Sequence, residues 1–144
     1  MTGYVIEVRG TPAPQGSKRH VGGGRMIESS AGVGPWREAV RGETQKIADT
    51  PLDGPVSVSV VFRMARPRGH YGTGRNADRV RDSAPAYPCG KGRNDIDKLA
   101  RAVLDALVMG GAMQDDGQVV HMDVWKVYGQ PGCQIEVWNT GGGE

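Results

Sequence analysis

The sequence contains few aromatic residues, only two cysteines and no long apolar run. Aromatic residues make up 6% of the 144 residues, so the core must be built mainly from aliphatic side chains. Cys89 and Cys133 lack the spacing of metal ligands, and two thiols do not form a disulfide framework, so we interpret them as reduced. No segment approaches the ~20 apolar residues that span a bilayer, and the N-terminus is not typical of a signal peptide. These absences predict a cytoplasmic protein with no membrane partner.

The net charge is also low, at +2, which argues against a chain that binds polyanions over its whole surface. The basic residues are unevenly distributed, and the Gly-, Pro- and Arg-rich segment at about 65–93 contains only two acidic residues, Asp78 and Asp82. Such a segment is typical either of a surface for a polyanionic partner or of a solvated loop. The candidate residues for that partner are Arg66, Arg68, Arg75, Arg79, Arg81, Lys91 and Arg93, together with Lys18 and Arg19 in an earlier loop.

Residue patterns predict four main strands and two helices. The strands are expected at 4–9, 56–64, 119–128 and 133–138, and the helices at 36–48 and about 95–109. The last two strands are expected to pair as an antiparallel hairpin, with Trp125 and Trp138 in the core. This order of elements predicts an α+β fold in which helices pack on a mixed β-sheet. We expect one domain over residues 1–138, with an insert at about 65–93, and a flexible tail at 139–144.

Carboxylates gather around the second predicted helix. Asp95 and Asp97 flank one apolar residue at its start, and Asp115 and Asp116 follow the glycine pair that ends it. Like charges this close repel each other unless a cation lies between them, and carboxylate oxygens are ligands that Mg²⁺ and Mn²⁺ prefer. We expect the strand after the helix to return to the helix start, so that the carboxylates converge. The alternative, equally supported by the spacing, is that Asp95 caps the helix and the later pair forms a turn.

Helical spacing separates a polar face from a core stripe on this helix. Asp97, Arg101 and Asp105 share the polar face. The predicted core stripes are Trp36, Val40 and Ile47 on the first helix and Ile96, Leu99, Ala100, Val103, Ala106 and Leu107 on the second. Leu104 and Val108 lie on the side of Asp97, where either the same subunit or a second subunit covers them.

The segments 94–107 and 115–120 resemble the RusA family of Holliday junction resolvases. The shared pattern is Asp-x-Asp at a helix start, a basic residue four positions later, Asp-Ala-Leu and then Asp-Asp-x-Gln-Val, and Lys126 on the next strand continues it. The resemblance implies a RusA-like endonuclease domain with a mixed β-sheet and packed helices. It also implies a homodimer that uses Mg²⁺, with Mn²⁺ able to substitute, to resolve four-way DNA junctions by paired symmetric nicks.

Position within this pattern implies roles for individual residues. Asp95, Asp97 and Asp116 would be the catalytic metal ligands, with Asp115 in support. Arg101 stands where the family has a catalytic lysine, and because a guanidinium does not readily release a proton, Arg101 would steady the scissile phosphate. The basic residues of the insert and Lys126 would contact DNA. The occurrence of the family in phages and prophages implies a role in DNA recombination, repair or packaging, in a bacterial or phage-infected cell.

Two other functions remain open from the sequence. One is a non-catalytic DNA-binding module, in which the aspartates are helix caps and turn formers and the basic insert binds. The other is a nuclease for different branched DNA, such as forks and flaps, because preference among branched substrates depends on surface shape and on contacts to the DNA backbone.

Overall fold

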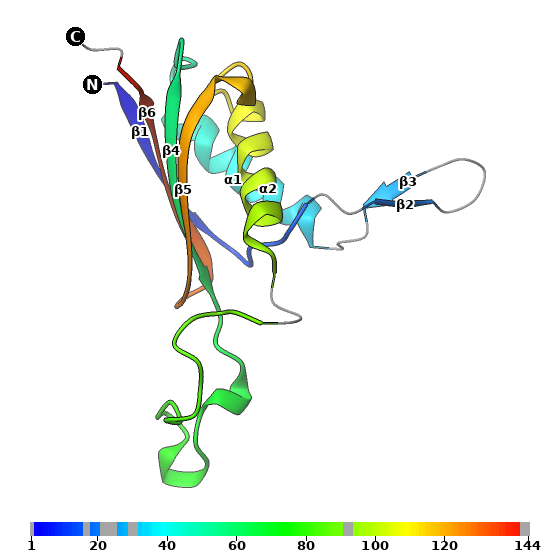
Figure 1. The fold of residues 1–144 in the computed structure, drawn as a ribbon, viewed down its shortest axis with the longest axis vertical. Coiled ribbons are helices and arrows are strands. Elements are labelled where there is room, and N and C mark those ends of the chain that lie inside the picture. The colour runs from blue at the N-terminus through cyan, green and yellow to red at the C-terminus, as the bar shows by residue number, and fades with distance from the viewer. Residues whose placement is uncertain (1, 16–17, 21–25, 29–31, 91–93, 142–144) are drawn as a thin grey trace.

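The structure, a computed structural model, describes residues 2–15, 18–20, 26–28, 32–90 and 94–141. Figure 1 shows two helices on one face of a four-stranded sheet, with an arm that extends beyond both layers. The sheet and helix layers consist of β1 (Gly3–Arg9), α1 (Val33–Ile47), β4 (Val56–Met64), α2 (Ile96–Met109), β5 (Val119–Tyr128) and β6 (Gly132–Asn139). Short elements are β2 (Lys18–His20), β3 (Met26–Glu28) and the 3-10 turns η1 (Arg68–His70), η2 (Gly74–Asn76) and η3 (Asp116–Gln118).

The sheet has the strand order β1-β6-β4-β5 and is mixed. β6 pairs antiparallel with β1 and β4, whereas β4 and β5 are parallel. This arrangement confirms the predicted α+β fold, but the predicted hairpin of β5 and β6 is wrong. β6 carries the fully buried Cys133, Ile135 and Val137, and its central position gives its backbone hydrogen-bond partners on both sides. A short connection between two strands therefore does not fix their pairing.

The core lies between the sheet and the two helices. Ile6 and Val8 of β1 point into the core and are fully buried. Val5 points to the opposite face of the sheet, because successive side chains of a strand alternate, and it is 59% exposed. Two ends of the predicted core stripes are wrong: Ile47 is 44% exposed and Ile96 is 41% exposed. Both lie in terminal turns, where the helix extends past the edge of the core. Thr44, on α1, and Ala102, on α2, are fully buried instead.

The prediction of core tryptophans is confirmed only for the first helix. Trp36 of α1 is buried in the core, whereas Trp125 of β5 is 57% exposed and Trp138 is partly buried. Trp125 and Trp138 lie on the sheet face opposite the helices, which explains their exposure. Leu104 and Val108 are partly buried and pack against the core of the same chain.

Several irregular segments are more ordered than their composition suggests. β2 lies in the earlier segment that was expected to be a loop, and it pairs antiparallel with β3. The C-terminal tail is tied down as far as Thr140, because the Asn139 N–H donates to the Thr2 carbonyl and the Thr140 N–H to the Pro55 carbonyl, each at 2.9 Å. Within the described part of the chain, no helix is long and apolar enough to cross a membrane.

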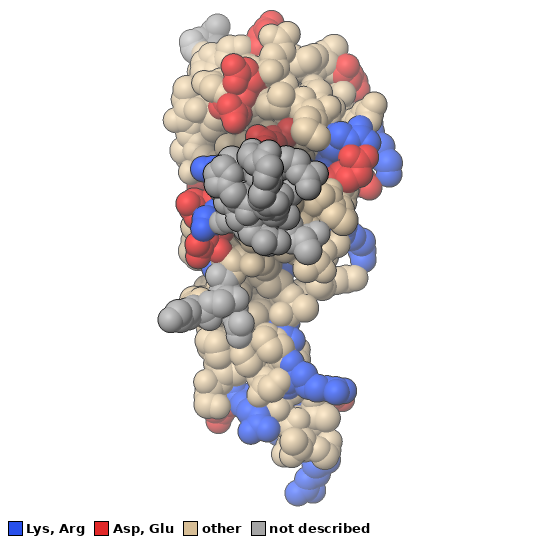
Figure 2. All heavy atoms as spheres, turned by 90° about the vertical axis from the view of Figure 1, so that its right-hand side faces the viewer, with Lys and Arg blue, Asp and Glu red and all other residues tan. Residues whose placement is uncertain are grey.

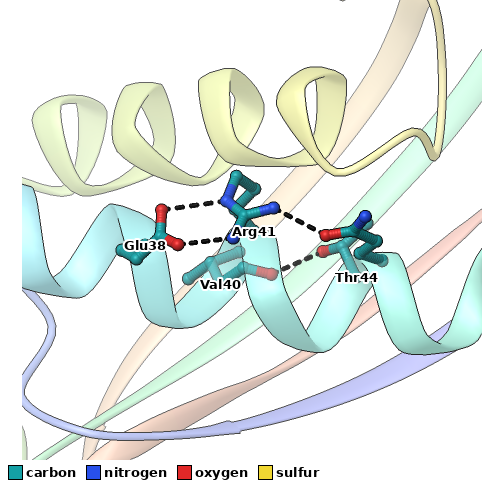
Figure 3. Close-up of polar contacts among 5 residues, drawn as sticks. Glu38, Val40, Arg41 and Thr44 are labelled. Carbon is teal, nitrogen blue, oxygen red and sulfur yellow. Dashed lines mark hydrogen bonds and ion pairs between the residues drawn. The ribbon is translucent and has the colours of Figure 1, made fainter.

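The two helices cross closely where α2 ends. The buried Thr44 hydroxyl donates to the Val40 carbonyl at 2.7 Å (Figure 3), which leaves its methyl group against Gly110. A Cβ atom on Gly110 would lie 2.7 Å from the Thr44 Cβ and 2.9 Å from the Arg41 carbonyl. On the solvent side, Arg41 hydrogen-bonds Glu38 and lowers the pKa of its carboxyl, but an exposed pair of this kind contributes little to stability. The crossing is therefore fixed mainly by packing.

This crossing predicts opposite effects for two glycine substitutions. Gly110→Ala forces a methyl group against the Thr44 side chain and the Arg41 carbonyl of α1, and it should lower the free energy of unfolding by about 1–3 kcal/mol. Gly42→Ala in α1 places its methyl group in open space, and removing a helical glycine should raise the free energy of unfolding by about 0.5–1 kcal/mol. Urea unfolding at neutral pH measures both, and an unchanged midpoint for Gly110→Ala would contradict the tight crossing.

Candidate active site

Asp95 and Asp97 lie at the N-terminus of α2, beside the carboxyl ends of the parallel strands β4 and β5. Asp95 is the N-cap residue, yet its side chain makes no capping hydrogen bond. Its carboxylate instead lies 3.5 Å from the Lys98 ammonium, and this side chain is 64% exposed. Asp97 is exposed in the first turn. The helix start is therefore formed by backbone groups, which leaves both carboxylates accessible to a ligand.

Lys126 is the residue of β5 that returns to this site. Its ammonium is partly buried and donates to the carbonyl of Asn94, next to Asp95, at 2.7 Å. This bond fixes the chain entering α2 against the end of β5. A cavity of about 240 Å³ opens beside the two residues. It is lined by Thr11, Pro12, Met64, Ala65, Pro67, Pro88, Asn94, Lys126 and Tyr128.

The polar face of α2 continues from Asp97 to Arg101, which is exposed, and then to Asp105, which is partly buried. Asp105 accepts a hydrogen bond from the Gln15 side chain, which also accepts one from Arg37 of α1. The Gln15 N–H donates to the Lys98 carbonyl at 3.0 Å. Gln15 thus ties the segment after β1 to both helices. Sequence reasoning missed it, because a single amide in a proline-rich loop carries no periodic or charge signal.

Asp115 and Asp116 lie in the turn that precedes β5. The Asp115 carboxylate accepts from the Gly117 N–H at 2.9 Å and caps η3, so one of its oxygens has a structural role. Asp116, the first residue of η3, is exposed. The turn-forming interpretation of Asp115 is therefore confirmed, while the Asp116 carboxylate points to solvent.

The two acidic groups lie at opposite ends of α2 (Figure 1). A helix that connects two parallel strands runs antiparallel to them, so its start lies at their carboxyl ends and its end at their amino ends. The 14 residues of α2 span about 21 Å. The strand register agrees, since Lys126 is opposite Phe62 and Val119 opposite Val56, about 20 Å apart along β4.

The expectation that the four carboxylates converge within one chain is therefore wrong. The strand after α2 begins at the far end, and only its own carboxyl end, with Lys126, reaches Asp95. Among the described residues, no group of three Asp, Glu, His or Cys side chains is arranged to hold a metal ion. The donor chemistry suits a hard cation, because exposed carboxylates are available at both ends. The geometry of a single chain does not complete such a site.

The arm, residues 65–90, leaves from the end of β4 and returns just ahead of α2. Figure 2 shows Lys and Arg side chains along it. Arg66 and Arg81 hold the arm together: Arg66 lies over the Tyr128 ring, 4.1 Å from its centroid, and donates to the Pro85 carbonyl at 2.8 Å, while Arg81 donates to the Tyr71 carbonyl at 2.7 Å. Arg81 is nevertheless exposed, as are Arg68, Arg75 and Arg79.

Four other basic candidates lie partly or wholly outside the described structure. Lys91 and Arg93 lie outside the described residues, and Lys18 and Arg19 are placed only by their backbone, in β2.

An accessible carboxylate pair at the carboxyl ends of parallel strands, with lysines beside it and a basic arm ahead of it, suits an enzyme that acts on nucleic acid. The family model Endodeoxyribonuclease RusA matches residues 7–138, and the chain belongs to the RusA family. No curated protein matches the sequence. The chain is thus an endodeoxyribonuclease of a family that resolves Holliday junctions, and the alternative of a non-catalytic DNA-binding module is not supported.

The two cysteines should differ sharply in reactivity. Burial in β6 raises the pKa of the Cys133 thiol to about 12, so this group stays protonated and unreactive at pH 8. Cys89 is exposed on the arm. A maleimide at pH 8 should therefore label Cys89 in the folded protein and both cysteines in urea, as mass spectrometry would detect. The Cys89→Ser variant should stay unlabelled while folded, and labelling of Cys133 in the folded protein would contradict the burial.

Proposed function

We propose that the protein is a Mg²⁺-dependent homodimeric endonuclease that resolves four-way DNA junctions by paired symmetric nicks. The single observation that supports this most strongly is the accessible Asp95–Asp97 pair beside Lys126, within a chain of the RusA family. Mn²⁺ is expected to substitute for Mg²⁺, since both prefer oxygen ligands. The proposed setting is DNA recombination and repair in the cytoplasm of a bacterial or phage-infected cell.

The proposed dimer supplies what one chain lacks. The family pattern implies that Asp95, Asp97 and Asp116 act together. Within one chain, however, α2 separates Asp116 from the Asp95–Asp97 pair by about 21 Å. In a twofold dimer, a residue of one subunit that meets a residue of its partner implies the reciprocal contact. An antiparallel arrangement of the two subunits would bring the Asp116 of each subunit to the Asp95–Asp97 pair of the other. Two identical composite sites would result, one for each strand to be cut.

The residues around Asp95 have separable tasks in the proposed reaction. When bound, Mg²⁺ supplies charge neutralisation at the scissile phosphate and lowers the pKa of water. Lys98 offsets the negative charge of Asp95 in the free protein, and Lys126 holds the backbone carbonyl just before it. Arg101 lies one helical turn beyond Asp97 and would hold a phosphate oxygen without transferring a proton. Hydrolysis then breaks one phosphodiester P–O bond in each of the two strands.

The arm is proposed to bind the DNA backbone. It emerges immediately before Asp95, and its exposed guanidinium groups would offset the repulsion between phosphates and the carboxylates of the site. Contacts to phosphates fix register and orientation, and selection of a branched substrate then rests on its shape. Forks and flaps remain the alternative substrates for the same chemistry.

Heterodimers of two inactive variants test the composite site. Asp97→Asn and Asp116→Asn homodimers should each bind junctions and lose cleavage, because every site lacks one ligand. A tagged and purified heterodimer of the two variants contains one intact composite site, so it should recover about half of the wild-type nicking rate. Nicking of a mobile four-way junction, beside duplex, fork and flap DNA and with or without Mg²⁺, measures this recovery and the substrate preference.

The matched control is the heterodimer of Asp95→Asn with Asp97→Asn. Both changes damage the same half of each composite site, so this heterodimer should remain inactive. Absence of recovery in the Asp97→Asn and Asp116→Asn heterodimer would overturn the composite arrangement. Wild-type cleavage by Asp97→Asn or by Asp116→Asn alone would instead remove that residue from the site.

Replacement of Arg68, Arg75 and Arg79 by Ala tests the arm. These side chains are exposed, whereas Arg66 and Arg81 are left in place because they hold the arm together. Affinity falls with salt, and each lost phosphate contact makes the plot of log affinity against log salt less steep by about 0.9. The loss of three contacts should therefore make it less steep by about 2.7. Titration of a labelled junction at several salt concentrations measures the slope. Lys46→Ala on α1, far from the arm, should leave it unchanged, and an unchanged slope for the triple variant would reject DNA binding by the arm.

A further inference from the structure

Gln118, the last residue of η3, makes four hydrogen bonds with one side-chain amide. Its Oε1 accepts from the N–H groups of Gln114, at 2.8 Å, and Asp115, at 3.1 Å. Its Nε2 donates to the carbonyls of Leu52 and Gly54, each at 2.9 Å. Two donors on one atom and an acceptor on the other are properties of an amide, so no charged or apolar side chain of this length can replace the set.

These bonds join two segments that are distant in sequence. The acceptor half of the amide closes the turn that carries Asp115 and Asp116, and the donor half attaches this turn to the segment that leads into β4. The Leu52 N–H reinforces the attachment by donating to the Ala112 carbonyl at 2.8 Å. The Gln118 amide and this backbone bond therefore hold the acidic turn in place relative to the sheet.

The same network separates the tasks of the two aspartates. With the turn closed, the Asp115 carboxylate caps the Gly117 N–H at 2.9 Å. Asp116 follows in the chain and is exposed. Without these hydrogen bonds, the turn would hold two neighbouring negative charges whose carboxylates have no fixed direction. The neutral amide holds the turn while adding no charge, which suits a carboxylate that must be available to a cation.

We propose that Gln118 is a positioning residue for the nuclease site: its amide fixes the direction in which Asp116 presents its carboxylate to the partner subunit. This inference rests on the proposed function, in which Asp116 is a ligand. Gln118 does not touch DNA or the reacting atoms. Its loss should weaken the site without removing a ligand, and so should resemble a lowered affinity for the divalent ion.

Gln118→Met tests this role in the intact dimer, because methionine has a similar length and cannot form the four bonds. The half-saturating Mg²⁺ concentration for junction cleavage should rise at least tenfold, and the rate should recover largely at saturating Mg²⁺. Mn²⁺ binding followed by calorimetry, without DNA, should weaken by a similar factor. Gln134→Met, at an exposed position of β6, is the matched control and should change neither quantity.

Gln118→Glu provides a second variant, since it keeps an acceptor for the two N–H groups but directs an oxygen at the Leu52 and Gly54 carbonyls. It should show the same rise in half-saturating Mg²⁺. A fall in thermal stability with unchanged metal dependence in both variants would show a purely structural role and overturn the proposal. In the wild-type protein, the N–H groups of Gln114 and Asp115 should be protected from hydrogen exchange, and unprotected exchange would overturn it without any variant.

Failure of this inference is distinguishable from failure of the proposed function. If Asp116→Asn abolishes Mn²⁺ binding and cleavage but Gln118→Met leaves both unchanged, Asp116 is a ligand that needs no positioning by Gln118. If Asp116→Asn leaves both unchanged, the ligand role itself is wrong, and the positioning role is wrong with it.

Discussion

One constraint organises this protein: a helix that joins two parallel strands must run back antiparallel to them. α2 obeys it between β4 and β5, so its start meets the carboxyl ends of these strands and its end meets their amino ends. Asp95, Asp97 and Lys126 therefore share one end of the sheet. Asp116 and Gln118 share the other end, next to the segment before β4. The two acidic pairs of the family pattern belong to one short stretch of sequence, but α2 holds them apart in space.

The same connection explains where the basic arm lies. It is inserted between the end of β4 and the start of α2, so it emerges from the end of the sheet that carries Asp95 (Figure 1). Two carboxylates alone would repel a phosphate backbone, and exposed guanidinium groups on a neighbouring projection would offset this repulsion. Arg66 and Arg81 stabilise the shape of the arm by donating hydrogen bonds to the carbonyls of Pro85 and Tyr71, respectively. The arm thus combines two arginines that hold its shape with the exposed Arg68, Arg75 and Arg79.

Local patterns predicted the elements well, and long-range relations were the part they missed. The 56–64 and 119–128 strands and the second helix were confirmed because their periodicity is local. The insertion of β6 between β1 and β4 depends on which buried faces fit together, and the residues of the turns do not predict it. Gln15 and Gln118 both form hydrogen bonds to residues more than sixty positions away in the sequence. A single amide side chain has no charge and belongs to no periodic pattern, so the sequence alone does not predict such a role.

Division of the acidic residues between two ends of a helix has a consequence for control of cleavage. In the proposed arrangement, a monomer contains only halves of sites, so it would not complete a cutting centre on any DNA. Twofold symmetry would complete both centres in the same step, because each contact between subunits occurs twice. Cleavage of two strands would then be coupled by assembly rather than by communication between distant sites. The rigidity of the acidic turn matters under this arrangement, since a carboxylate supplied across an interface cannot be guided by its own neighbours in the site.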